Sequence, residues 1–359
     1  MILFGIIGTG WRSEFFLRVA AACPEKFKVV GIVGRTPDKT RALGERFGVP
    51  TFGSAAELVE QGKPQFVVVS VSRGKEAAVM TDLAHLGVPI LSETPPGGML
   101  DELYAVWALV ENGAKIQVAE QYWAQPHHAA RLAFAASGKL GTVTQAQVSV
   151  AHGYHGISLI RRFLNVMFEP VTVTAMSFTS PIVEGPGRSG LPANESIIPS
   201  KQTFAHFDFG DRLGTFDHTG DQYFSFIRGQ RLLVRGERGE IVDATAVYLP
   251  DFRTPIHVTF ERHSAGLDGN LEGNYLKGIQ AGVEWVYRNP LIPAALSDEE
   301  IAIGTCLLRM SDFVNEGTPF YSLAEACQDR YLDLLMEQAL TSGDAVMSQP
   351  QPWQDESAI

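Results

Sequence analysis

The chain has 359 residues, of which 45% are hydrophobic, and carries a formal net charge of −11 at pH 7, with an isoelectric point near 5.3. This length exceeds one typical domain, so we expect two domains. The acidic surplus repels nucleic acid and anionic membrane surfaces, so we expect neither as a partner.

The N-terminal stretch "MILFGIIG" is apolar, but it has no basic residues and reaches a glycine after four residues. It is far shorter than the ~20 residues that span a bilayer, so we expect a strand here. Cys23, Cys306 and Cys327 lie far apart and fit no metal-ligand spacing. An odd number of distant cysteines argues against a disulfide framework, and we expect a reducing, cytoplasmic location.

The first third of the chain alternates short apolar runs with stretches of helical periodicity. The runs are "ILFGIIG" (2–8), "FKVVGIVG" (27–34), "FVVVSVS" (66–72), "VPILSE" (88–93) and "KIQVAEQ" (115–121). Helices are predicted over 37–48 and 101–113. Five strands with helical crossovers predict a doubly wound α/β domain of the Rossmann type over residues 1–121.

The pattern changes after Gln121. A helix with Pro126 in its first turn is predicted, followed by alternating stretches such as "VTQAQVSV" (143–150), "QTFAHFDFG" (202–210) and "IHVTFER" (256–262). Period-two alternation is typical of an open antiparallel sheet, so we expect an α+β domain over 122–345. Residues 180–201 are rich in Pro, Gly and Ser and are predicted to form a long loop, and 346–359 a flexible tail.

Aromatic and polar residues alternate in "HFDF" (206–209) and "QYFSFIRG" (222–229). We expect both to be strands that pack within the sheet. One face of this sheet would then be buried in a homo-oligomer, either a dimer or a tetramer.

A glycine-rich turn follows the first apolar run. In "GTGWRS" Gly8, Gly10 and Ser13 stand at the three positions of G-x-G-x-x-G, with Trp11 and Arg12 between them. The first glycine permits a tight turn, the second lets a pyrophosphate approach the backbone, and the third position requires a small residue. We therefore predict that these five residues bind a dinucleotide.

The end of the second strand bears on the choice of cofactor. An acidic residue that binds the adenosine ribose is usual there, but this chain has Gly34, Arg35 and Thr36. A guanidinium and a hydroxyl suit a 2′-phosphate, so we favour NADP over NAD. Further cofactor contacts are expected where the other strands end, at Ser70, Ser72, Glu93 and Gln121.

The strand layout, "SETPP" (92–96) and "GKLGTV" (138–143) together resemble the Gfo/Idh/MocA family, the glucose-fructose oxidoreductase and inositol dehydrogenase type. The resemblance implies a Rossmann domain and a second domain with a large open sheet. It also implies a nicotinamide cofactor between them and a carbohydrate-like substrate, a sugar or polyol, that undergoes hydride transfer.

Two signatures of this family are incomplete in the chain. Its Glu-Lys-Pro motif falls on Glu93, Thr94 and Pro95, so the lysine is replaced by threonine. A proline and a histidine that the family carries after the third strand fall on Ser72 and Glu76. Threonine can donate a hydrogen bond but supplies no charge.

The second signature, Asp-x-Gly-x-His-x-x-Asp, falls on residues 151–158. Gly153 and His155 match, whereas Ala151 and Ser158 replace both aspartates. By resemblance His155 is the general acid or base, although it lacks the expected carboxylate partner. A histidine satisfied by backbone groups at a domain interface is the alternative.

Tyr154 or His152 is expected to assist His155, with Thr94 as a further polar group. Glu120, Gln121 and Tyr122 should either face the cleft or form an ordinary hinge. We expect no metal, because suitably spaced carboxylates or thiolates are absent around His152 and His155 or around His127 and His128.

Two functions are consistent with these features. The first is an NAD(P)-dependent oxidoreductase acting on a sugar, polyol or related hydroxyl or keto compound. The second is a dinucleotide-binding protein without dehydrogenase activity, such as a sensor, a partner subunit or a non-redox sugar-modifying enzyme. We predict the first, which rests on the glycine-rich turn and the fold layout. The second is the alternative and rests on the replaced residues Thr94, Ala151 and Ser158.

Overall fold

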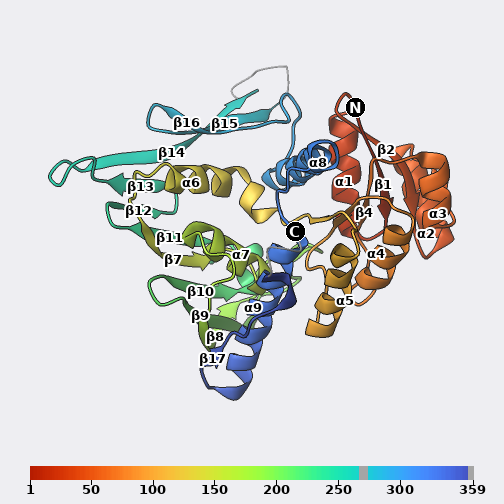
Figure 1. Cartoon of the computed structure of the whole chain (residues 1–359). Helices are drawn as coiled ribbons and strands as arrows, with labels where there is room; N and C mark the ends of the chain where they lie inside the picture. The colour runs from red at the N-terminus through yellow and green to blue at the C-terminus, as the bar shows by residue number, and fades with distance from the viewer. Residues whose placement is uncertain (267–273, 355–359) are drawn as a thin grey trace.

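The structure, a computed structural model, describes residues 1–266 and 274–354. Within these residues the chain forms two sheets, a parallel one at the N-terminal end and a mostly antiparallel one after it (Figure 1). The fold class predicted from the sequence is confirmed. Helices α8 and α9, in blue in Figure 1, come from the end of the chain and lie between the two sheets.

The first sheet has six strands, all parallel to their neighbours, in the order β3-β2-β1-β4-β5-β6. The prediction of five strands was wrong by one, because β3 has only two residues and gives no periodic signal. The strands are β1 (Ile2–Ile7), β2 (Phe27–Val33), β3 (Thr51–Phe52), β4 (Phe66–Val69), β5 (Ile90–Ser92) and β6 (Ile116–Val118).

Helical crossovers connect these strands. They are α1 (Trp11–Ala22), α2 (Pro37–Phe47), α3 (Ala55–Glu57) with the π-helical turn η1 (Leu58–Gly62), α4 (Glu76–His85) and α5 (Leu100–Glu111). Local chemistry explains the two that were predicted. Helix α2 begins at a proline and ends at Gly48 with φ 66°, and α5 begins with acidic residues that favour the positive end of the helix dipole.

The second sheet has eleven described strands, in the order β16-β15-β14-β13-β12-β11-β7-β10-β9-β8-β17. Every neighbouring pair is antiparallel except β7 and β10. The strands are β7 (Val143–Ser149), β8 (Thr172–Val183), β9 (Ile197–Asp208), β10 (Leu213–Thr219), β11 (Arg231–Gly236), β12 (Gly239–Val242), β13 (Thr245–Tyr248), β14 (Ile256–Ala265), β15 (Tyr275–Ala281), β16 (Glu284–Arg288) and β17 (Val346–Met347).

Helices α6, α7 and α9 pack on one face of this sheet, whereas α8 packs against α1 of the first domain (Figure 1). Ser297 and Ser322 cap α8 and α9 through capping boxes. The remaining helical segments are η2 (Tyr122–Ala124), α6 (Pro126–Ala136), α7 (Gly153–Leu164), η3 (Gly220–Tyr223), α8 (Asp298–Glu316), α9 (Leu323–Ser342) and η4 (Pro352–Gln354). Within the described residues, no helix is both long enough and apolar enough to cross a membrane.

Two hydrophobic clusters form the core. One joins β1, β2 and α1 to α8, so that Ile303, Leu307 and Met310 complete the core of the first domain. The other begins beneath α4 and α5 and continues through α9 and α7 into the second sheet. The last two long helices therefore bind the two domains together.

Three predictions about the second domain were wrong in part. Residues 180–183 and 197–201 belong to the strands of a β8–β9 hairpin, with Pro181 opposite Pro199, so the long loop shrinks to 184–196. The stretch 222–229 is not a strand, because Thr219 and Gln222 cap the short helix η3 there. In the expected tail, β17 pairs with β8 and Trp353 is buried; residues 355–359 lie outside the described residues.

Candidate active site

The carboxyl ends of the parallel strands gather the predicted cofactor residues at one edge of the first sheet. Chain order reverses at β1, which lies between β2 and β4. Ligands of doubly wound sheets bind at such a switch point, beyond the carboxyl ends of the strands. Gly8 follows β1, Ser70 follows β4 and Glu93 follows β5.

The glycine-rich turn has the shape that a dinucleotide requires. Gly8 has φ +129°, and an added Cβ would lie 1.9 Å from the carbonyl oxygen of Ser70, so only glycine fits. Gly10 is the N-cap of α1, without a capping side chain, and a Cβ there would meet nothing within 4 Å. The space in front of the first turn of α1 is open, and its N–H groups can receive a phosphate. The turn therefore fits the pyrophosphate of a dinucleotide.

Arg12 holds two carboxylates together at this turn. Its Nε lies 2.9 Å from Oε1 of Glu93, and its Nη1 lies 2.5 Å from Oε1 of Glu299 on α8. Burial lowers the pKa of Arg12, but the two glutamates outweigh burial and raise it above its usual value. Buried Nη2 of Arg12 and Oγ of Ser13 have no partner among the described residues. Both can take part in polar contacts with a ligand.

The turn after β2 leaves no room for an acidic side chain. A Cβ at Gly34 would lie 2.2 Å from Oγ1 of Thr40 and 2.5 Å from Cγ2 of Thr9. Arg35 and Thr36 beside it are exposed. This turn is thus bordered by an exposed cation and an exposed hydroxyl.

The other predicted cofactor residues lie near the same edge with different exposures. Trp11 is 52% exposed at the start of α1, and Ser72 is exposed beyond β4. Ser70 and Gln121 are buried. The side-chain amide of Gln121 donates to Glu299, 3.3 Å away, and its Oε1 has no partner among the described residues.

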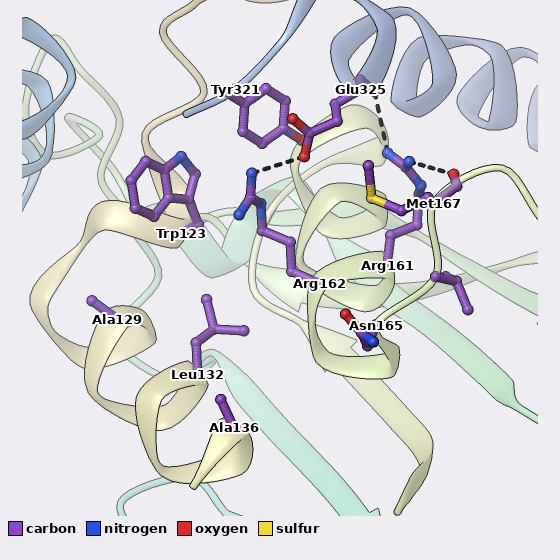
Figure 2. Close-up of a pocket in the computed structure, with 11 residues that line it drawn as sticks. Trp123, Ala129, Leu132, Ala136, Arg161, Arg162, Asn165, Met167, Tyr321 and Glu325 are labelled. Atoms are coloured by element: carbon purple, nitrogen blue, oxygen red, sulfur yellow. Dashed lines mark hydrogen bonds and ion pairs between the residues drawn. The ribbon is translucent and has the colours of Figure 1, made fainter. Parts of the chain in front are cut away.

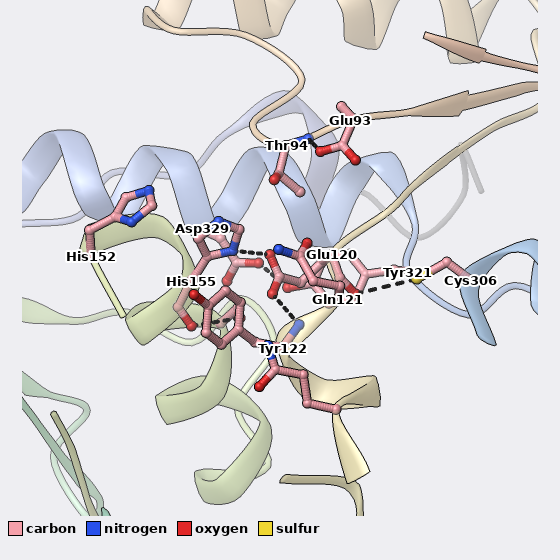
Figure 3. Close-up of polar contacts among 12 residues, drawn as sticks. Glu93, Thr94, Glu120, Gln121, Tyr122, His152, His155, Cys306, Tyr321 and Asp329 are labelled. Atoms are coloured by element: carbon pink, nitrogen blue, oxygen red, sulfur yellow. Dashed lines mark hydrogen bonds and ion pairs between the residues drawn. The ribbon is translucent and has the colours of Figure 1, made fainter. Parts of the chain in front are cut away.

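His155 has a carboxylate partner, and the expectation that it lacks one was wrong. Nδ1 of His155 lies 2.6 Å from Oε2 of Glu120 (Figure 3). Glu120 is fully buried, and its other oxygen accepts the backbone N–H of Tyr122 at 2.9 Å. The carboxylate comes from the end of the first domain, 35 residues before the histidine. Nε2 of His155 has no hydrogen-bond partner among the described residues.

The first turn of α7 presents His155 to this junction between the domains. Close packing fixes the helix, since a Cβ at Gly156 would lie 2.5 Å from the ring of Phe216 on β10. At Gly153 a Cβ would lie 2.0 Å from Oδ1 of Asp333 on α9. These two glycines allow α7 to lie against both neighbours, so the position of His155 is set by tertiary packing.

Other polar rings surround His155. The ring of Tyr122 lies 4.6 Å from that of His155, and the ring of His152 lies 4.9 Å from it. Nδ1 of His152 lies 2.6 Å from the hydroxyl of Tyr223, which also accepts the backbone N–H of His152. Although His152 is exposed as a residue, desolvation of its ring and the nearby His155 lower its pKa.

Sequence reasoning missed Tyr223 and His218 as members of this group. The two rings lie 5.3 Å apart, and Nε2 of His218 is buried with no described partner. Burial lowers the pKa of His218 to about 4, against the opposing effect of Asp217 and Asp221. Tyr223 was assigned to a strand, and His218 occurs in "FDHT" at the end of β10 with no local motif.

Tyr154 and Thr94 occupy different surroundings. Tyr154 is buried, and its hydroxyl has no partner among the described residues, so it resembles a core residue more than a surface donor. Thr94 is half-buried, and Figure 3 shows it on the first-domain side, above the Glu120–His155 pair. Its backbone N–H donates to Glu93 at 3.2 Å. The ring of Tyr154 lies 5.2 Å from that of His155.

A separate cavity of about 380 Å³ lies among α6, α7 and the start of α9 (Figure 2). Arg162 lies between the rings of Trp123 and Tyr321 and pairs with Glu325 at 3.0 Å. None of the predicted catalytic or cofactor residues lines this cavity. We therefore locate the site by its side chains, at the domain junction. In the described part of the chain, no cluster of three or more metal-ligating side chains occurs.

The fold and this edge define a class: a two-domain protein with an NAD-binding Rossmann domain. Residues 2–121 match the model of a family described as an oxidoreductase family with an NAD-binding Rossmann fold. The N-terminal domain therefore belongs to the Gfo/Idh/MocA family, and the resemblance predicted from the sequence is confirmed. A comparison with curated proteins finds no match to the chain.

Solved structures of similar fold cover the second domain as well. A levoglucosan dehydrogenase in complex with NADH and L-sorbose has a TM-score of 0.69 and 15% identity, covering 98% of this chain and 99% of that one. A myo-inositol dehydrogenase from Corynebacterium glutamicum has a TM-score of 0.65 and 15% identity, covering 98% and 100%. An Agrobacterium radiobacter oxidoreductase, in complex with NAD+, L-tartaric acid and magnesium, has a TM-score of 0.65 and 16% identity, covering 96% and 98%. At these identities the likeness shows the fold alone.

Proposed function

We propose that the protein is an NAD(P)-dependent oxidoreductase that transfers hydride to or from a sugar, a polyol or a related hydroxyl or keto compound. The buried Glu120–His155 pair beside the dinucleotide turn carries this proposal. The family of the N-terminal domain and the sugar and inositol dehydrogenases of similar fold support it.

In the proposed reaction the cofactor transfers the hydride and His155 transfers the proton. A bound nicotinamide ring supplies or accepts the hydride. Glu120 accepts a hydrogen bond from Nδ1–H of His155, which leaves Nε2 as the atom that can take up the proton of a substrate hydroxyl. Glu120 is thus a positioning residue that fixes the orientation of the ring.

A polyhydroxyl substrate would find several hydrogen-bonding groups near this histidine. His152 lies beside His155 and contacts Tyr223, and Thr94 lies on the first-domain side above the Glu120–His155 pair (Figure 3). Thr94 can orient a hydroxyl but does not supply the positive charge of a lysine. The acid/base role must therefore depend on His155.

For the cofactor we propose NADP over NAD. Gly34 has no room for the acid that would bind a ribose hydroxyl, and the exposed guanidinium of Arg35 suits a 2′-phosphate. Arg35→Asp should raise the Kd for NADPH and lower or preserve that for NADH, because it replaces attraction with repulsion. Titration with both nucleotides measures the ratio of the Kd for NADPH to the Kd for NADH. If Arg35→Asp leaves this ratio unaltered, Arg35 does not select the cofactor.

The function itself is tested by a binding and turnover experiment on the purified chain. NADPH and NADH are titrated first, and a panel of polyols, sugars and keto sugars is then followed by reduced-nicotinamide absorbance. Turnover of at least one member supports the proposal.

The second candidate, dinucleotide binding without dehydrogenase activity, rests on Thr94, Ala151 and Ser158. It becomes the better account if the cofactor binds tightly but no compound is turned over. Gain of activity in Thr94→Lys combined with Ala151→Asp and Ser158→Asp would strengthen it further.

A further inference from the structure

Arg188 lies at the tip of the β8–β9 hairpin, in the second domain. Backbone hydrogen bonds join Gly187 and Gly190 in both directions, at 2.9 and 3.0 Å, so Arg188 and Ser189 form a tight two-residue turn. Gly190 has φ +108°, a conformation that glycine tolerates. Twelve paired residues in each strand lead up to this segment. The hairpin therefore holds Arg188 at a defined place.

That place is the start of α1 in the first domain. The guanidinium carbon of Arg188 lies 4.0 Å from the ring centroid of Trp11. Trp11 is the first residue of α1, directly after Gly10, and is 52% exposed. A cation–π contact of this kind joins the second domain to the turn that would hold a pyrophosphate.

The charges at the turn show what Arg188 adds. Arg12, the only basic residue of the turn, is already paired with both Glu93 and Glu299, so this group has an excess of negative charge. A second cation beside this group would add to the attraction that the N–H groups of α1 offer a dianionic pyrophosphate. Arg188 is exposed and has no carboxylate partner among the described residues. The guanidinium of Arg188 can therefore bind an anion.

We propose that Arg188 is a cofactor-binding residue contributed by the second domain, which pairs with the pyrophosphate across the start of α1. The inference rests on the proposed dinucleotide binding and adds a residue to it. Trp11 serves as the platform that holds the guanidinium in place. The β8–β9 hairpin thereby covers the outer side of the bound cofactor.

The test measures the affinity of the full chain for NADPH and for 2′-phospho-ADP-ribose, which shares the pyrophosphate and the 2′-phosphate but lacks nicotinamide. Arg188→Ala should weaken both by about tenfold or more, as expected for loss of one charge-assisted contact. Arg188→Lys should recover part of the loss. Trp11→Ala should give an intermediate loss, because the charge remains and its platform does not.

Arg253→Ala is the matched control. Arg253 is also an exposed arginine stacked on an aromatic ring, 4.5 Å from that of Phe252, in the loop between β13 and β14. Arg253→Ala removes the same charge as Arg188→Ala and should leave the affinities for both ligands unchanged. Affinity should also depend less on salt in Arg188→Ala than in wild type.

The outcomes separate this inference from the proposed function. If wild type binds both ligands and Arg188→Ala binds them equally well, Arg188 has no such role and the function stands. A loss for NADPH alone would assign Arg188 to the nicotinamide end and would also overturn the inference. If wild type binds neither ligand, the dinucleotide function fails, and the role of Arg188 fails with it.

Discussion

Gly8 and Gly10 stand two residues apart, yet a side chain would meet opposite conditions at these positions. At Gly8 it would collide with the backbone of Ser70 in a left-handed conformation, whereas at Gly10 it would enter open space. The fold therefore requires the first glycine, whereas within the described residues no protein atom restricts a side chain at the second.

Gly10→Val should accordingly fold with a thermal stability close to that of wild type and lose dinucleotide binding, because the branched side chain occupies the space of the pyrophosphate. Gly8→Ala should lower the free energy of unfolding by about 1–3 kcal/mol through strain. Thermal melting and NADPH titration of both variants measure these effects. A stable Gly10→Val protein with unchanged affinity would refute dinucleotide binding at this turn.

His128 gives the fold a dependence on pH. Burial, together with Arg131 and His127, lowers its pKa to about 3. The pKa of an unfolded histidine is about 6.5, so between these values the unfolded state binds more protons. The free energy of unfolding therefore falls as the pH falls through this window.

His128→Gln should remove this contribution. Relative to wild type, the variant should gain about 2 kcal/mol between pH 6.5 and pH 4.5. Urea unfolding at the two pH values measures the change, and His206→Gln, at an exposed position on β9, is the control. A constant difference between His128→Gln and wild type would show that His128 titrates alike in the folded and unfolded states, against the lowered pKa.

The partnership of Glu120 and His155 shows the limit of sequence reasoning at the residue scale. The sequence singles out the histidine because it falls on the second signature of the resembling family. Its carboxylate could not be assigned, because Glu120 belongs to the end of β6 and reaches His155 only when α7 lies against that edge. Glu120 was expected near the cleft, but no local spacing connects the two residues.

At the scale of elements, α7 and α9 are joined by a buried ion pair. Nη1 of Arg161 lies 2.5 Å from Oδ1 of Asp329, and both side chains are almost inaccessible. The other oxygen of Asp329 accepts the hydroxyl of Tyr321. This pair fixes the helix that carries His155 against the helix that anchors the second domain.

Asp329→Ala should lower the free energy of unfolding by about 3–5 kcal/mol, because it leaves the Arg161 charge buried without a partner. Asp312→Ala is the matched control, since Asp312 pairs with Arg309 at 3.5 Å on the half-exposed side of α8. Its effect should lie within about 1 kcal/mol. Equal losses for the two variants in denaturant unfolding would contradict the assigned importance of the buried pair.

Elements with a strong period or clear end signals could be predicted, and very short ones could not. The buried strands of the first sheet and helix α2 have continuous apolar runs or clear end signals. Strand β3 is too short for any period. The alternation in 222–229 resembles a strand, but the hydrogen bond between Thr219 and Gln222 favours a helical turn there, which brings Tyr223 to His152.

At the scale of the whole molecule, the end of the chain returns to its beginning. Helix α8 completes the core beside α1, and its Glu299 meets Arg12 in the dinucleotide turn. Trp353 is buried beside α9 and donates to Gln328 at 2.9 Å, within the stretch expected to be a tail. Such long-range contacts leave no local pattern in the sequence. The two domains could therefore be predicted, but the packing of α8 and α9 between them could not.

The proposed mechanism depends on one residue. Because Thr94 stands in place of a lysine, we propose that proton transfer depends on His155, whose ring Glu120 orients. The most direct measurement is the turnover of His155→Ala relative to wild type, with the best substrate of the panel and with cofactor affinity measured in parallel. Turnover should fall by about 10² to 10⁴, the usual contribution of a positioned acid or base, while the Kd for the dinucleotide stays unchanged. A His155→Ala protein as active as wild type would contradict the account.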